Sequence, residues 1–450
     1  MFKKFNGVTM LTIAALLSAC GGGGGSTDGS SGSNSGGAAT ASFSVGGTVS
    51  GLAAGKQVVL QNNAGDNLTV SANAAFTFAG KVNQNASYAV TVATQPAAQT
   101  CTVSNGSGSN VVANISNVAV NCVTDIAGVV TTLAGGAWGA VDGTGTAAGF
   151  DNPVGIATDG SNVYVSDMFS STIRKIAIST GAVTTLAGKA YASGSTDGIG
   201  VAARFDYPKG LYADGANLYV TSNATVRKIV MATGAVTTLA GKYMTFGNTD
   251  GNGSTALFNN PWGITGDGVN LYVTDLGSHT IRKIVIATGE VTTLAGRAGL
   301  SGSNDGYGVA ALFNKPLGIT TDKSSLYVTD SANQTIRKIV LATTEVTTLA
   351  GKPGVVGNSN GTGAAASFKS PIGIATDGTN LFVSDSDNHT LRKIVIATGA
   401  VSTLAGTAGS LGSTDGSGAA ARFYYPFGVA TDGNSLYVAD RGYHLIRKIR

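Results

Sequence analysis

One phrase of about 55 residues recurs six times between residue 130 and Arg450. Its third copy reads NPWGITGDGVNLYVTDLGSHTIRKIVIATGEVTTLAG, starting at Asn260. The proline near the start of each copy recurs at intervals of 55, 53, 55, 55 and 55 residues, at Pro153, Pro208, Pro261, Pro316, Pro371 and Pro426. So regular a period indicates a repeat architecture, and it is longer than the usual helical repeats. The sequence therefore predicts six equivalent structural units.

Each copy contains four short β-rich runs separated by turn signals, as in GIATDG, NLYVTD, TIRKIVI and VTTLAG. An Asp-Gly pair such as Asp159-Gly160 joins the first two runs, and a Thr-Gly pair such as Thr180-Gly181 joins the last two. Glycine supplies the positive φ that a tight hairpin needs. Each copy is thus predicted to be a four-stranded antiparallel meander.

The runs are apolar on both faces, so a single meander would leave one apolar face in water. Arranging the meanders around an axis buries both faces, which predicts an all-β, six-bladed β-propeller over residues 129–450. The last copy ends after its third run, and the missing run, VTTLAG, precedes the first copy at residues 130–135. We expect this N-terminal strand to pair with the last blade and close the ring.

The third run of each copy and the turn before it carry a recognisable signature. It is clearest as Asp385, Asn388, His389, Leu391 and Arg392, with weaker versions at Asp275, His279 and Arg282 and at Asp440, His444 and Arg447. Over residues 129–450 the chain resembles the NHL-repeat family of six-bladed propellers. Members of that family bind proteins, RNA or small molecules, and a few are enzymes, so the resemblance implies a fold more than a function.

The N-terminal segment is typical of an export signal, with Lys3 and Lys4 before an apolar stretch over residues 8–17. Leu-Ser-Ala-Cys at residues 17–20 resembles a lipobox, which implies cleavage after residue 19 and lipidation of Cys20. An ordinary signal peptide with a chance cysteine is the alternative. Gly21, in place of the Asp that retains lipoproteins in the inner membrane, favours the outer membrane of a Gram-negative cell envelope. Membrane contact through the lipid anchor alone is expected.

Residues 20–42 are mostly Gly, Ser, Ala and Asn, which predicts a flexible tether. Residues 43–125 contain short alternating apolar and polar runs, which predict a small antiparallel β-sandwich similar to the immunoglobulin-type modules of bacterial surface lipoproteins. Cys101 and Cys122 are expected to form a disulfide in an exported chain, stabilising it by about 3 kcal/mol. No histidine lies nearby, so zinc binding or catalysis by these cysteines is not favoured.

The charge pattern argues against a nucleic-acid partner. The net charge is +4 with 28 Lys and Arg, but the repeated Arg-Lys pairs account for 12 of these residues. They are part of the repeat rather than a basic patch.

An Asp at the end of the second run lies seven residues before an Arg in five copies. These predicted structural pairs are Asp167 with Arg174, Asp275 with Arg282, Asp330 with Arg337, Asp385 with Arg392, and Asp440 with Arg447. A bidentate pair across the hairpin is the economical interpretation. In copy two Ser222 replaces the Asp, so we expect Arg227 to be solvated or to use another acceptor.

Two further repeated features could suggest ligand sites. The histidines, His279, His389 and His444, share one repeat position, which favours turn stabilisation over a zinc site. The phrase DGxGxxAxF, as at residues 142–150, lacks the ligands of an EF-hand and the lysine of a Walker loop. Its Asp is expected to cap a short turn and its Phe to fill the gap between blades.

Positions that differ between copies are better candidates for recognition, because a scaffold requirement should appear in every copy. Such positions precede the innermost strand and should surround one mouth of the central channel, where we expect binding by Asn152, Tyr207, Asn260, Trp262, Lys315, Tyr425 and Phe427. The residue between Pro and Gly varies as Val154, Lys209, Trp262, Leu317, Ile372 and Phe427. The loops leading into the blades add Trp138, Tyr191, Tyr243, Met244 and Phe246, which suit a protein or glycan surface or, alternatively, packing between blades.

The same mouth offers a weak calcium hypothesis. Asp151, Asp206, Asn259 and Asn314 come from successive copies and carry oxygen ligands. No other cofactor is expected.

Catalysis is less favoured than binding. A metal-dependent propeller enzyme of the lyase or lactonase type would need inward-facing His, Glu or Asp, whereas Glu290 and Glu345 lie in turns of the opposite face. The favoured hypothesis is an envelope-anchored, non-catalytic scaffold that presents one propeller face to an extracytoplasmic protein or glycan. A purely structural envelope protein is a third possibility.

Overall fold

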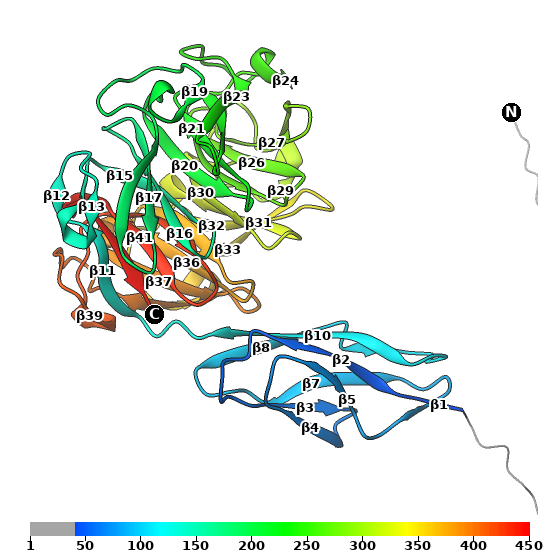
Figure 1. Ribbon diagram of the computed structural model, residues 1–450. Coiled ribbons are helices and arrows are strands. Elements are labelled where there is room, and N and C mark those ends of the chain that lie inside the picture. The colour runs from blue at the N-terminus through cyan, green and yellow to red at the C-terminus, as the bar shows by residue number, and fades with distance from the viewer. Residues whose placement is uncertain (1–40) are drawn as a thin grey trace, which may run out of the picture.

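The computed structural model describes residues 41–450. The expected signal peptide, Cys20 and most of the tether lie outside the described residues. Within them the chain is all β apart from short 3-10 turns, and none of the helices found there is long and apolar enough to span a membrane. A small sandwich comes first, followed by a ring of six sheets (Figure 1).

The sandwich contains two four-stranded sheets in the orders β5-β2-β10-β8 and β4-β3-β7-β9. Their strands are β2 (Val45–Ser50), β3 (Val58–Asn62), β4 (Asp66–Val70), β5 (Ala75–Thr77), β7 (Tyr88–Thr94), β8 (Gln99–Ser104), β9 (Ser107–Gly108) and β10 (Ile115–Thr124). A short β1 (Ser42–Phe43) pairs with β6 (Val82–Asn83). Alternate residues such as Val58, Leu60 and Val120 are fully buried between the sheets.

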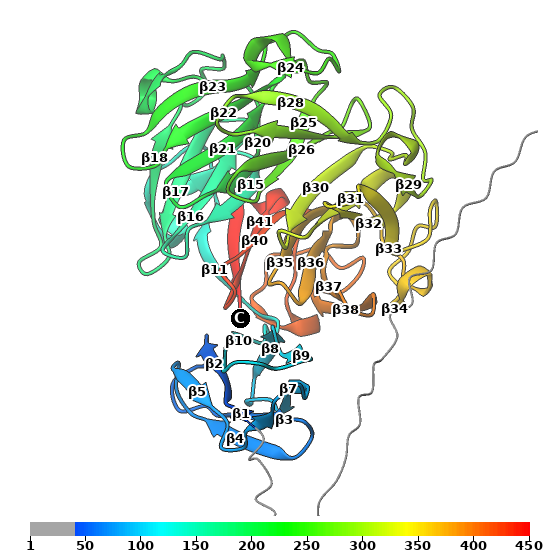
Figure 2. The same ribbon diagram turned by 90° about the vertical axis from the view of Figure 1, so that its right-hand side faces the viewer.

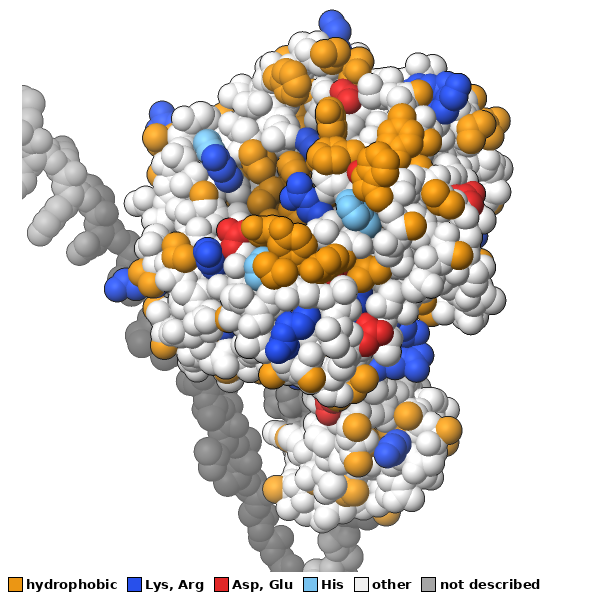
Figure 3. Space-filling model, turned by 90° about the vertical axis from the view of Figure 1, so that its left-hand side faces the viewer, with side chains coloured by type: hydrophobic (Ala, Val, Ile, Leu, Met, Phe, Trp, Pro, Cys, Tyr) orange, Lys and Arg blue, Asp and Glu red, His pale blue; other side chains and the backbone are white. Residues whose placement is uncertain are grey.

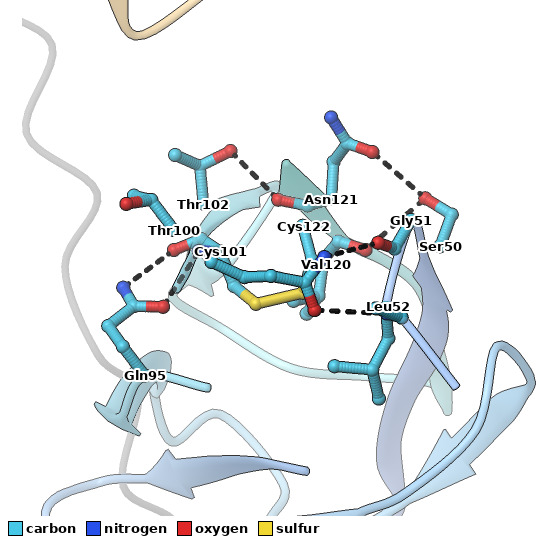
Figure 4. The surroundings of a disulfide bond; sticks show 12 residues. Ser50, Gly51, Leu52, Gln95, Thr100, Cys101, Thr102, Val120, Asn121 and Cys122 are labelled. Carbon is cyan, nitrogen blue, oxygen red and sulfur yellow. Dashed lines mark hydrogen bonds between the residues drawn. A yellow bond between two sulfur atoms is a disulfide. The ribbon is translucent and has the colours of Figure 1, made fainter. Parts of the chain in front are cut away.

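Two details differ from or add to the expectation for this domain. The sandwich is not wholly antiparallel, because β10 runs parallel to β2 while it pairs antiparallel with β8. The disulfide between Cys101 and Cys122 is present, and it joins directly paired residues of β8 and β10 within one sheet (Figure 4). The Gln95 side chain bonds both the N–H and the C=O of Cys101, at 2.7 and 2.9 Å.

Each of the six propeller sheets starts with an innermost strand that begins at the repeat proline. These strands surround the axis (Figure 2) and are β15 (Pro153–Thr158), β20 (Pro208–Ala213), β25 (Pro261–Gly266), β30 (Pro316–Thr321), β35 (Pro371–Thr376) and β40 (Pro426–Thr431). The second strands are β16 (Asn162–Asp167), β21 (Asn217–Ser222), β26 (Asn270–Asp275), β31 (Ser325–Asp330), β36 (Asn380–Asp385) and β41 (Leu436–Asp440).

The third and fourth strands complete the predicted meander. The third are β17 (Thr172–Ala177), β22 (Thr225–Val230), β27 (Thr280–Val285), β32 (Thr335–Val340), β37 (Thr390–Val395) and β42 (Leu445–Ile449). The fourth are β18 (Ala182–Ala187), β23 (Ala235–Gly241), β28 (Glu290–Ala295), β33 (Glu345–Ala350), β38 (Ala400–Ala405) and, in blade six, β11 (Val129–Gly135).

The predicted closure of the ring is confirmed. β11 pairs antiparallel with β42, with Val130 opposite Ile449, so the strand after the sandwich completes the last blade. The phenylalanine of each DGxGxxAxF loop lies in the core between neighbouring blades; Phe150, for example, packs with Ala439 of blade six and Val165 of blade one.

Each blade has a fifth strand that the sequence did not predict. The Gly-x pair of each DGxG phrase forms a two-residue strand at the outer edge, namely β13 (Gly143–Thr144), β19 (Gly198–Ile199), β24 (Gly251–Asn252), β29 (Gly306–Tyr307), β34 (Gly361–Thr362) and β39 (Gly416–Ser417). A 3-10 turn follows each one, such as η1 (Gly145–Ala147). This added pairing brings the preceding Asp to the outer strands of its blade.

The repeated arginine is fully buried in all six blades and its guanidinium group contacts two side chains, an arrangement we call the arginine fork. In blade four Nη1 of Arg337 lies 2.8 Å from Asp330 Oδ2 of the second strand, and Nη2 lies 2.8 Å from Asp305 Oδ1 of the DGxG loop. The five predicted structural pairs are all in contact, at 2.8 to 3.5 Å. Each pair uses one guanidinium nitrogen, so the predicted bidentate geometry is replaced by a fork between two side chains, which are both carboxylates in blades one, three, four and six.

The DGxG aspartate is therefore an arginine ligand rather than the turn cap that the sequence suggested. Blade two has no Asp at the end of its second strand. Arg227 bonds Asp197 at 2.6 Å instead, which confirms the prediction that it uses another acceptor. Blade five has Asn360 in the loop and keeps Asp385 at 2.8 Å from Arg392. The ring of the loop phenylalanine lies 5.1 to 5.3 Å from each guanidinium carbon, which adds a cation–π contact.

A glycine of each innermost strand sets how closely the blades approach. A Cβ on Gly318 would lie 2.1 Å from the Ile372 carbonyl oxygen of the next blade, so no larger residue fits. At the same level a Ser or Thr hydroxyl of the second strand reaches the neighbouring blade, as Thr329 does to Ile372 O at 2.8 Å. Blade six has Ala439 at this position, so its contact with blade one lacks that hydrogen bond.

Candidate functional site

The face at which the innermost strands begin, called here the mouth face, carries most of the residues that the sequence singled out. Figure 3 shows hydrophobic side chains gathered around a hollow on one face of the ring, together with Lys, Arg and His side chains. The residues that form this region are described next.

An aromatic pair spans the propeller axis at the mouth. Each innermost strand contacts the next one around the ring, so β25 and β40 lie on opposite sides. The rings of Trp262 and Phe427 nevertheless lie 5.9 Å apart, and they form a small apolar cluster with Val154, Ile372 and Leu317. The residues expected to surround the mouth therefore narrow it, and the space beside them has a volume of about 60 Å³.

A cation flanks each half of this aromatic pair. Lys209 Nζ lies 4.8 Å from the centre of the Trp262 ring and donates a hydrogen bond to Asn260 Oδ1. The Arg441 guanidinium carbon lies 5.3 Å from the centre of the Phe427 ring, and its Nε donates to Asn152 Oδ1. Such contacts stabilise a cation but do not neutralise it.

Neither cation forms a salt bridge with a carboxylate in residues 41–450. Burial lowers the pKa of Lys209 to about 8, and burial also lowers the pKa of Arg441. The carboxylates of Asp206 and Asp275 oppose this effect on Lys209 from beyond salt-bridge distance. Within residues 41–450 the mouth thus holds two positive groups that no carboxylate contacts directly.

Two hollows lie on either side of the aromatic pair. The first, of about 690 Å³, lies among blades five, six and one and is lined by Trp138, Asp151, Phe169, Tyr424, Tyr425 and Arg441, among others. The second, of about 430 Å³, is lined by Met168, Tyr207, Lys209, Asn223, Phe246, Asn259, Asn260 and Trp262. These volumes are in the range of small-molecule sites.

Large apolar side chains are exposed around both hollows. Trp138 is 70% exposed, Phe246 55% and Tyr207 50%. The ring centres of Tyr424 and Tyr425 lie 4.8 Å apart with their planes tilted by 38°, and both rings lie next to His389. Exposed aromatic clusters of this kind are typical of interaction surfaces.

The predicted binding residues are not all equivalent. Asn260 and Trp262 line the second hollow with Tyr207, while Asn152, Tyr425 and Phe427 line the first. Lys315 is exposed and lines neither hollow. Sequence reasoning placed Lys209 among the variable residues of the mouth, where it is the one polar residue between Pro and Gly, but did not choose it as a binding residue. It missed Arg441.

The three histidines lie in separate turns, and each connects one blade to the next. Nδ1 of His279 accepts a hydrogen bond from the Lys315 N–H at 3.1 Å, and His389 and His444 bond Tyr425 and Asn152 in the same way. The three residues that donate these hydrogen bonds have positive φ. Burial lowers the pKa of all three histidines, which favours the neutral imidazole whose Nδ1 can accept a hydrogen bond.

Oxygen atoms of the predicted calcium set already have partners or belong to different hollows. Asp151 Oδ1 accepts from the Trp138 indole at 3.1 Å, and Asp206 Oδ2 accepts from Asn223 at 2.8 Å. Asp151 lines the first hollow and Asn259 the second. Across residues 41–450 no three His, Cys, Asp or Glu side chains are grouped to hold a metal ion. Calcium binding stays a prediction.

Comparison with known proteins finds relatives that match about half of this chain. No protein-family model matches the chain. Protein SUPPRESSOR OF QUENCHING 1 of Arabidopsis thaliana is 32% identical over 276 residues, which are 57% of this chain and 26% of that protein. NHL repeat-containing protein 2 of Homo sapiens is 28% identical over 291 residues, which are 56% of this chain and 40% of that protein. The propeller is therefore similar in sequence to an NHL repeat-containing protein.

The chain spans well under half the length of these relatives, so their activities do not transfer to it directly. Solved structures share the fold of this chain at low sequence identity. A Bacteroides thetaiotaomicron protein of unknown function superposes with a TM-score of 0.58 at 21% identity, covering 88% of this chain and 90% of that one. An auxiliary nutrient binding protein of the same organism gives 0.55 at 15% identity, covering 87% and 90%.

Proposed function

We propose that this protein is a non-catalytic binding scaffold whose mouth face docks an extracytoplasmic protein or glycan. The observation that carries the proposal is the concentration of exposed aromatic side chains around two hollows on one face of a rigid ring. Repeated blades fix these side chains in place, so little ordering of the site is needed when a partner binds. The auxiliary nutrient binding protein with the same fold is compatible with such a role.

The alternative, a metal-dependent propeller enzyme, has less support. Catalysis at the mouth would need several ionisable ligands or a base with an activating partner. The mouth instead offers an aromatic pair with two cations held by asparagine side chains. These groups suit recognition of a ligand better than its chemical conversion.

Attachment to the cell envelope is a second part of the proposal, and it rests on the lipobox-like sequence ending at Cys20. Lipidation of Cys20 would hold the folded domains at the outer membrane through the stretch of residues 20–42. Replacing Cys20 with Ser should move the protein from the membrane fraction to the soluble fraction of the expressing cell. Recovery of the Cys20→Ser protein in the outer membrane would contradict the anchor.

A binding comparison tests the docking face. Residues 41–450 would be screened against an oligosaccharide array and used in a pull-down from extracytoplasmic proteins, with Tyr207→Ala and Tyr425→Ala as variants. Tyr307→Ala is the matched control, because Tyr307 is 61% exposed on the outer strand β29. We expect the two mouth variants to lose partners that the control retains. Equal recovery by all three would place the binding face elsewhere.

A further inference from the structure

The second hollow contains an ammonium group without a directly bonded carboxylate in residues 41–450, although Asp206 and Asp275 act on it from a greater distance. Lys209 is 7% exposed, lines this hollow and forms no salt bridge within residues 41–450. An ammonium has three N–H donors, and the hydrogen bond recorded for Nζ goes to Asn260 Oδ1. Burying a charge without a counter-ion is costly, and an anionic ligand would remove that cost.

The walls of the second hollow are flat and apolar. Trp262 lies beneath Lys209, while Tyr207 and Phe246 are 50% and 55% exposed at its edges. Aromatic rings offer large contact areas with little conformational freedom to lose. They match the C–H face of a pyranose ring.

Unpaired amide groups lie beside these rings. The side chain of Asn259 and the Nδ2 of Asn260 have no hydrogen-bond partner in the described range 41–450, whereas Asn223 is held by Asp206 and Met244. An amide carries both donors and an acceptor, which suits hydroxyl groups. The hollow thus combines one cation, aromatic walls and amide groups.

We propose that the second hollow binds a uronic acid unit of an acidic oligosaccharide. The carboxylate bonds Lys209 Nζ, the sugar ring lies against the aromatic walls, and its hydroxyl groups bond Asn259 and Asn260. This inference rests on the proposed binding function and specifies its ligand. A volume of about 430 Å³ accommodates a ligand of this class.

Calorimetric titration of residues 41–450 with trigalacturonate and with its methyl ester tests the charge requirement, because the ester keeps the shape and loses the charge. We expect the acid to bind at least tenfold more tightly than the ester. Lys209→Met should reduce the affinity for the acid to that for the ester. Lys352→Met, a control that removes an exposed lysine outside the hollow, should leave it unchanged.

Melting temperatures of the variants show whether each one is folded, and Lys209→Met should melt no lower than the parent because it removes a buried charge. Equal affinity for the acid and the ester, or no effect of Lys209→Met, would overturn the uronate assignment while leaving a glycan-binding scaffold intact. Binding of a peptide carboxylate without binding of trigalacturonate would also overturn it. Loss of all partners from the array and the pull-down would reject the proposed function itself.

Discussion

The arginine fork predicts that equivalent aspartates differ in importance between blades. Asp197 and Asp305 occupy the same repeat position, and their side chains are 47% and 49% exposed. Asp197 accepts from Arg227 at 2.6 Å and from Thr238 at 3.0 and 3.1 Å. Asp305 accepts from Arg337 at 2.8 Å and from Thr348 at 3.0 and 3.2 Å. Substitution by Ala therefore removes nearly the same bonds in each blade.

What remains after the substitution is different. Arg337 keeps Asp330 at 2.8 Å, but Arg227 keeps only backbone carbonyl groups and a serine hydroxyl as acceptors. Losing the hydrogen bonds of a half-exposed Asp costs about 1 to 2 kcal/mol. Leaving a fully buried Arg without a carboxylate costs about 3 to 5 kcal/mol. Asp197→Ala should thus destabilise the propeller by about 2 kcal/mol more than Asp305→Ala.

Urea unfolding of residues 41–450 at pH 8 measures this difference, because burial raises the pKa of Asp167 to about 6 and that of Asp440 to about 7, and pH 8 lies above both. Asn360→Ala is a further control, since Arg392 keeps Asp385 and the cost should be close to that of Asp305→Ala. Equal costs for Asp197→Ala and Asp305→Ala would refute the idea that the second carboxylate protects the fork.

Three further outcomes are expected. Ala439→Ser should raise the free energy of unfolding by about 1 kcal/mol, because a hydroxyl there can reach the neighbouring blade as that of Thr329 does; an unchanged urea midpoint would contradict this. Replacing both Cys101 and Cys122 with Ser should destabilise the sandwich by about 3 kcal/mol, and calorimetry should show the propeller transition unmoved. Burial raises the pKa of Asp440 to about 7, although the Tyr424 N–H and Arg447 act in the opposite direction. The contribution of Asp440 to the free energy of unfolding is therefore full below about pH 4 and is lost as the pH rises through 7. The free energy of unfolding between pH 5 and 8 should therefore fall more steeply for the parent than for Asp440→Asn, and parallel curves would argue against it.

The ring could be predicted because the sequence repeats with a regular period. The proline spacing indicates six units, and the unmatched run at residues 130–135 indicates which strand completes blade six. The parallel pairing of β10 with β2 was missed, since alternation of apolar residues does not specify the direction of a neighbouring strand. The arginine fork was half predicted, because Asp330 is seven residues from Arg337 across one hairpin, whereas Asp305 is 32 residues away in a loop.

The candidate site was predictable in location but not in detail. Variation between copies pointed to the mouth face, where Trp262, Tyr207 and Tyr425 lie. Contact between Trp262 and Phe427 across the axis depends on side-chain size on opposite blades, which no local pattern records. Lys209 was placed at the mouth and could have been chosen as a binding residue, because it is the charged exception at a position that is apolar in the other five copies.

Intrinsic fluorescence gives the most direct test of the claim that partners bind at the mouth. The chain has two tryptophans, Trp138 and Trp262, and they line the first and the second hollow respectively. Titrating a partner into the parent, Trp138→Phe and Trp262→Phe proteins should change the emission of at least one tryptophan and identify the hollow that is occupied. Saturable binding with unchanged emission from both tryptophans would contradict docking on this face.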